Sequence, residues 1–168
     1  MKKTLIIIIL VVYIASIAVV NFFGLEIKVF DGTTYVESIA CNTVTLQNEN
    51  PIELTPSRYR GTNNDIPLFI FDFTPAPDGE SYTADAESII TNPNALQINY
   101  EVLPHLADNT EVKFEFDEAA IEGVAVFHEL SKTFIFLKPN KLFNVTIRST
   151  DGSNKSTTIS IMGRIPNN

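Results

Sequence analysis

The apolar residues of this chain form one long run followed by many short ones. Residues 5–23 are apolar at all but two positions. A helix of that length, rising about 1.5 Å per residue, spans the hydrocarbon core of a bilayer. Lys2 and Lys3 precede the run, and Glu26 is the first charged residue after it. The positive-inside rule then predicts a single transmembrane helix, with the N-terminus in the cytoplasm and the rest of the chain outside.

A cleavable signal peptide is the alternative interpretation of the same segment. Ser16-Ile17-Ala18 places small residues where a signal peptidase reads them, which would put cleavage after Ala18. The apolar run continues through Phe22 and Phe23, however, and this favours an uncleaved anchor. Both alternatives export the remainder of the chain, either held at the cell membrane or secreted.

From Leu25 onward the pattern predicts β-strands. Short runs rich in Val, Ile, Phe, Tyr and Thr alternate in polarity and are separated by Gly, Pro, Asn and Asp. No long stretch keeps the period of a helix. The first part predicts a hairpin of strands 25–30 and 33–36 around Asp31-Gly32, a strand over 42–47, a surface loop over 48–65, and a strand over 67–73 that is buried on both sides.

Residues 74–80 contain Pro75, Pro77 and Gly79 and interrupt any strand, so they are the expected domain boundary. Seven further strands are predicted after them, over 88–90, 95–102, 111–116, 123–128, 133–137, 143–149 and 155–161. This number and spacing is typical of an immunoglobulin-like sandwich. The expected organisation is all-β: an anchor or signal over 1–24, a small β module ending in an acidic linker over 25–80, and an immunoglobulin-like β-sandwich over 81–168.

The C-terminal half also carries a recurring pattern of motifs. A strand ends in Pro, a polar turn leads into a strand with an aromatic residue, a short Ala-Val strand follows, and a hairpin closes the chain, at residues 100–104, 107–114, 124–126, 144–152 and 155–161. In these features it resembles the group 2 bacterial immunoglobulin-like domain. Phe114 stands where that family usually has Trp, and Lys141-Leu142-Phe143 stands where it has a Gly. The resemblance implies a surface-exposed, non-enzymatic module and identifies no ligand.

Charge is distributed unevenly along the chain. The net charge is −8, and the chain after Lys2 and Lys3 contains ten basic and twenty acidic side chains. From Asp65 to Glu129 the sequence contains fourteen carboxylates and a single Lys. Nucleic acid is a poor partner for such a surface, because phosphate binding needs clustered Lys and Arg. An ordinary solvated surface is one interpretation of the acidic block, and electrostatic steering of a cationic partner is the other.

The single cysteine, Cys41, cannot form an intrachain disulfide, so packing alone must stabilise the fold. We expect Cys41 to be buried and unreactive. The predicted strands place Phe114, Val126, Phe136 and Ile147 in the core.

The sequence contains no recognisable catalytic motif. The two histidines, His105 and His128, have no metal-ligand spacing around them, and His128 is expected at a strand edge. Nucleophile elbows and phosphate-binding glycine loops are absent. No enzyme and no cofactor is therefore predicted. Calcium is the one ion considered, because several carboxylates crowd the expected boundary; its candidate ligands are Asp72, Asp78, Glu80, Asp85 and Glu87.

These features favour a membrane-anchored, surface-exposed immunoglobulin-like protein with a structural, adhesive or ligand-binding role and no catalysis. Its expected partners are the membrane, through residues 5–23, and a protein or an envelope polymer. The alternative is an accessory subunit of a membrane or envelope complex that works through its transmembrane helix.

Overall fold

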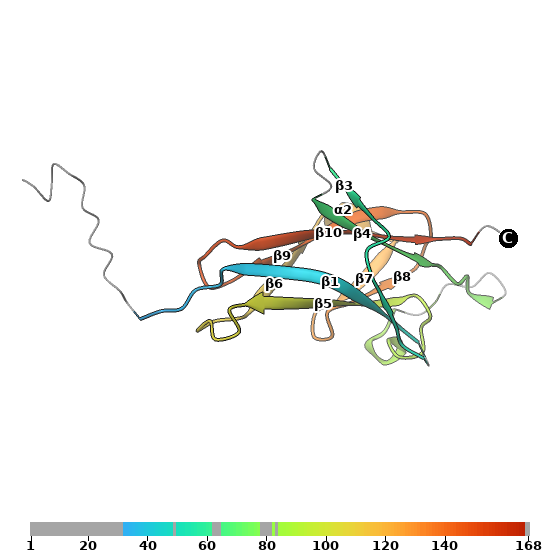
Figure 1. Ribbon diagram of the computed structural model, residues 1–168. Coiled ribbons are helices and arrows are strands. Elements are labelled where there is room, and N and C mark those ends of the chain that lie inside the picture. The colour runs from blue at the N-terminus through green and yellow to red at the C-terminus, as the bar shows by residue number, and fades with distance from the viewer. Residues whose placement is uncertain (1–31, 49, 62–64, 78–81, 83, 167–168) are drawn as a thin grey trace, which may run out of the picture. The chain divides into compact units, whose positions relative to one another are not determined.

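Two five-stranded sheets pack face to face in the computed structural model (Figure 1), which describes residues 32–48, 50–61, 65–77, 82 and 84–166. From Thr34 onward the described chain belongs to one unit built around a single core. The anchor segment 5–23 and the predicted strand 25–30 lie outside the described residues. Within the described part of the chain, no helix is long and apolar enough to cross a membrane.

The first sheet is antiparallel throughout, with the strand order β2-β1-β5-β8-β7. Its strands are β1 (Ser38–Gln47), β2 (Ile52–Leu54), β5 (Ala95–Leu103), β7 (Ala125–His128) and β8 (Thr133–Phe136). The strands β2 and β7 form its two edges.

The second sheet has the order β3-β4-β10-β9-β6. Its strands are β3 (Arg58–Arg60), β4 (Ile66–Asp72), β6 (Val112–Phe116), β9 (Leu142–Ser149) and β10 (Ser156–Arg164). The pair β4 and β10 is parallel, and the other three pairs are antiparallel. The strands β3 and β6 form the edges of this sheet.

The core lies between the sheets and follows the two-residue period of the strands. In β9, Phe143, Val145 and Ile147 are buried while Leu142 and Asn144 are exposed. Buried residues from before residue 80, such as Val44 and Phe69, belong to the same cluster as those of β9. Cys41 is buried in this cluster as well, and burial raises the pKa of its thiol to about 12, so the expectation of a buried cysteine is confirmed.

The expected division into two β modules at residues 74–80 is wrong for this structure. The strand β1 pairs with β5 and β4 pairs with β10, so strands from before residue 80 complete both sheets. The strand β4 ends at Asp72, just before the prolines. The chain is held at Thr74: the buried side chain of Asn94 accepts a hydrogen bond from Thr74 N at 2.9 Å and donates one to Thr74 O at 2.8 Å.

Most of the predicted C-terminal strands are confirmed, and the described residues show four differences from the prediction. The predicted strand over 33–36 is not formed, and the expected loop over 48–65 contains β2 and β3. The expected strand over 88–90 is replaced by a 3-10 helix over Ala86–Ser88 and a turn. Phe114, Phe136 and Ile147 are buried as predicted, but Val126 is only half-buried. In β7 it is Ala125 that belongs to the core, and Phe127 packs against the core.

Two carboxylates hold the segment that leads into β1. The Asp108 side chain accepts a hydrogen bond from Thr34 N, and the Asp151 side chain accepts one from Val36 N. Asp151 also accepts hydrogen bonds from the Ser149 hydroxyl and from Ser153 N. Desolvation raises the pKa of Asp151, but these hydrogen bonds outweigh it and hold the pKa well below its usual range.

Because the pKa of Asp151 is low, we expect the free energy of unfolding to change with pH in the acidic range. A carboxylate with a depressed folded-state pKa stabilises the fold above its unfolded pKa of about 4, and this contribution is lost as pH falls through the folded pKa. Urea unfolding of the wild type and of Asp151→Asn should therefore differ at neutral pH, and the difference should shrink as the pH is lowered below about 4. A difference independent of pH would contradict the proposed role of the charge.

Candidate binding groove between the edges of the two sheets

The groove with the largest volume among those described lies where the chain crosses from β6 to β7. The crossing contains one short helix, α2 (Glu118–Ile121), followed by a turn. Asp117 begins the helix: its backbone is extended and its Oδ1 accepts a hydrogen bond from Ala119 N at 3.0 Å, which satisfies a free helix N–H. Gly123 has a φ of 63°, a left-handed conformation that glycine adopts without strain, and it turns the chain toward β7.

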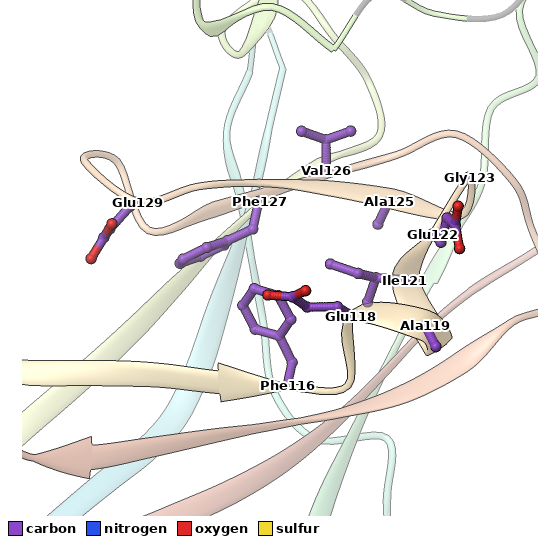
Figure 2. A pocket seen from close by; sticks show the side chains of 10 residues that line it. All are labelled: Phe116, Glu118, Ala119, Ile121, Glu122, Gly123, Ala125, Val126, Phe127 and Glu129. Carbon is purple, nitrogen blue, oxygen red and sulfur yellow. The ribbon is translucent and has the colours of Figure 1, made fainter.

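The groove has a volume of about 860 Å³ and opens to solvent. This volume is in the range of known ligand sites, which are mostly apolar with a few placed polar groups. The lining comes from the end of β6, from α2 and its turn, and from β7, and it consists of Phe116, Glu118, Ala119, Ile121, Glu122, Gly123, Ala125, Val126, Phe127 and Glu129. Figure 2 shows Phe116 and Phe127 projecting toward one another from the two edge strands.

The aromatic floor of the groove rests on the core. The rings of Phe116 and Phe127 meet edge to face, with their centroids 5.3 Å apart. Beneath them, Phe134 is fully buried and lies 5.4 Å from Phe116 and 4.6 Å from Phe127, centroid to centroid. Aromatic pairs at these separations gain energy beyond their area burial. The floor is therefore a fixed surface supported from below.

The rim of the groove is rich in carboxylates. Glu118, Glu122 and Glu129 are all exposed, and none of them forms an ion pair within the described part of the chain. Basic side chains are nearby: the Lys138 ammonium lies close to Gly123, and Lys132 lies over the Phe114 ring at 5.3 Å. The three glutamates come from the acidic block of the sequence, and they give the groove wall a local excess of negative charge that attracts cations.

Three of the five proposed calcium ligands, Asp72, Asp85 and Glu87, lie among the described residues. The Asp72 carboxylate is engaged by Arg164 Nε at 2.9 Å, and the backbone oxygen of Asp85 accepts hydrogen bonds from Ser88. Glu87 is exposed, while Asp78 and Glu80 lie outside the described residues. Among the described residues, no group of three or more His, Cys, Asp or Glu could hold a metal ion. The calcium site stays a prediction.

The two histidines lie outside the lining of the groove. His128 ends β7, as expected for a strand-edge residue, and its Nε2 lies 2.7 Å from the backbone oxygen of Ala84. His105 Nε2 pairs with a Glu101 oxygen at 3.2 Å on an exposed surface.

Sequence reasoning did not find the groove. Asp117 followed by Glu118-Ala119-Ala120 is a helix-start signal, and it could have identified α2. The groove itself depends on β6 and β7 being the edges of two different sheets, which no local pattern shows.

No protein-family model, curated protein or solved structure matches the chain. The fold is therefore known as a β-sandwich from its own strand pairing, and the groove is interpreted from its own residues.

Proposed function

We propose that this protein is a non-catalytic binding module, anchored in a membrane by residues 5–23 and presenting its sandwich on the outer side. The observation that carries the proposal is the open groove beside β7, with its apolar floor and acidic rim. A partner can be bound specifically where a fixed apolar surface lies next to charged groups that have no ion-pair partner. The partner class that best fits this groove is a protein.

An immunoglobulin-like arrangement is part of the proposal. The order β1-β5-β8-β7 corresponds to strands A, B, E and D of that fold, and β6-β9-β10 corresponds to C, F and G. This correspondence would make β4 an additional strand beside G, and β2 and β3 an insertion. It supports the resemblance to group 2 bacterial immunoglobulin-like domains, which are implied to be surface-exposed and non-enzymatic.

The described chemistry supports a binding role over catalysis. The thiol of Cys41 is buried with a raised pKa, so it is a poor nucleophile. The groove wall offers carboxylates and hydrocarbon, and neither histidine lines it. The anchor is supported by the length of the apolar run and by the lysines that precede it.

Site-specific photocrosslinking in intact cells tests the proposal. A photoreactive amino acid at Ala119, which is exposed on α2 and lines the groove, should give an adduct with a partner of defined mass. The matched control is the same amino acid at Tyr59, which is 54% exposed on the edge strand β3 of the second sheet. Membrane topology is tested separately. Protease added to intact spheroplasts does not enter the cytoplasm, so it should digest the sandwich if the sandwich lies on the outer side.

The outcomes separate the proposal from its alternatives. Equal adducts at both positions, or none at Ala119, would contradict a binding groove. A second variant scrambles residues 5–23 while keeping their hydrophobicity. If this variant loses function and groove variants do not, an accessory subunit that works through its helix is favoured. An adduct with a carbohydrate instead of a protein would identify an envelope polymer as the ligand.

A further inference from the structure

We infer that the groove takes an extended, basic segment of a partner protein, which pairs with β7 as an additional strand of the first sheet. This inference rests on the proposed binding function and names its ligand class. It is carried by the backbone geometry of β7, by the spacing of the apolar floor, and by the charge of the rim.

The groove runs along the edge of β7. Ala125, Val126 and Phe127 all line it, although successive side chains of a strand point to opposite faces. Figure 2 shows Val126 directed away from Ala125 and Phe127. Three consecutive residues can line one groove only if the groove follows the strand edge, where the backbone itself is presented.

The hydrogen bonds of β8 show which backbone groups of β7 point into the groove. Phe136 N donates to Asn94 O at 3.1 Å, toward β5, and Leu137 N donates to Val124 O at 2.7 Å, toward the β7 side. Because these directions alternate along a strand, Ile135 faces β7 and forms the hydrogen-bonded pair with Val126.

Ala125 and Phe127 consequently stand opposite Phe136 and Phe134 in non-hydrogen-bonded pairs. Their N–H and C=O groups are directed away from β8, into the groove. An edge with outward backbone donors and acceptors is a template for another strand.

The floor fits the side chains of such a strand. An added strand lies about 4.8 Å from β7, and every second side chain of it faces inward. Inward-facing apolar side chains would cover Phe116, Phe127 and Ile121, which come from the two edges and from α2. The short β7, of four residues, limits the pairing to a segment of similar length.

Charge complementarity selects the class of segment. Glu122 follows α2 at one end of the groove and Glu129 follows β7 at the other, while Glu118 begins α2 and extends back toward Phe116 (Figure 2). Carboxylates therefore stand at both ends of the apolar floor. A segment with Lys or Arg on either side of an apolar stretch places opposite charges against them. A neutral or acidic segment would leave the three carboxylates without partners.

A selection from displayed random dodecapeptides tests the ligand class, with the full chain in lipid nanodiscs as the target. The selected peptides should alternate apolar residues and be enriched in Lys and Arg. The triple variant Glu118→Lys, Glu122→Lys, Glu129→Lys should bind a synthetic consensus peptide about a hundredfold more weakly, because opposite charges become like charges.

The matched control makes the same change of net charge elsewhere. Glu37, Glu53 and Glu87 are exposed and do not line the groove, so replacing all three by Lys should change the affinity by no more than a few-fold. The triple variant Glu118→Gln, Glu122→Gln, Glu129→Gln removes the rim charges with little steric change, and its loss of peptide affinity should be intermediate. Peptides without basic residues, no selected peptides, or equal losses in rim and control variants would overturn the inference.

Hydrogen exchange at single-residue resolution tests the strand pairing. The amides of Ala125 and Phe127 should exchange more slowly once the consensus peptide is bound, while that of Val126, already paired with β8, should change little. Protection confined to other strands would overturn the inference. A partner adduct at Ala119 together with unprotected Ala125 and Phe127 would leave the binding function standing and refute strand addition alone.

Discussion

A protein comprising only residues 84–165 should aggregate and show no cooperative unfolding, whereas residues 34–168 should unfold in one cooperative transition. The shorter chain lacks β1 and β4, which pair with β5 and β10 in the middle of the two sheets. Removing them exposes the backbone edges of β5 and β10 and takes the fully buried Val44 and Phe69 out of the core. Exposed apolar edges of this kind promote aggregation.

Circular dichroism during heating, together with size-exclusion chromatography, measures this difference. Residues 34–168 serve as the control, because they contain every described strand. A monomeric 84–165 fragment that melts in a sharp transition would show that the C-terminal strands form an independent domain, and would contradict the single-core interpretation.

The sequence predicted strands well where alternation is strict. In β9, exposed and buried positions alternate from Leu142 to Ser149, and the Asp-Gly turn after it marks a hairpin with β10, which the structure confirms. Alternation fixes which residues face the core, because each side chain is committed to one face by the pleat. Phe143 and Ile147 could therefore be assigned from the sequence alone.

Where every residue of a strand is apolar, the face is ambiguous. Residues 124–127 read Val-Ala-Val-Phe, so the pattern does not distinguish one register from the next. The prediction placed Val126 in the core, but Ala125 and Phe127 occupy the inner face. A shift of one residue exchanges the two faces of a strand.

The false domain boundary has a different cause. Prolines in 74–77 show correctly that β4 ends, but the end of a strand carries no information about which core that strand belongs to. This is decided by the pairing of Leu68 with Ser160 and of Phe71 with Gly163, residues about ninety positions apart in the chain. The buried Asn94 then binds the backbone of Thr74, which lies 20 positions earlier in the chain.

The groove could not be predicted for the same reason. Its rim residue Glu118 and its floor residue Phe127 acquire their roles from the order of strands in two sheets, which places β6 and β7 at facing edges. The sequence supplied only the acidic block and the idea of a cationic partner. The structure concentrates part of that charge around an apolar surface.

Phe134→Ala should lower the free energy of unfolding by about 3–5 kcal/mol, as found for large aromatic-to-alanine changes in cores. Phe134 is fully buried, and its ring centroid lies 4.6 Å from that of Phe127 and 5.3 Å from that of Phe143. Truncation leaves a cavity between the sheets and removes the support beneath the groove floor. Urea unfolding of the full chain in detergent micelles, followed by circular dichroism, measures the loss.

Val126→Ala is the matched control, because Val126 lies on the other face of the neighbouring strand and is only half-buried. It should cost about 1 kcal/mol or less. Since the groove floor rests on Phe134, the Phe134→Ala variant should also bind groove ligands more weakly at temperatures where it is still folded. A loss of stability below about 1 kcal/mol for Phe134→Ala would mean that the sheets do not pack through this residue, and the aromatic floor would then need another support.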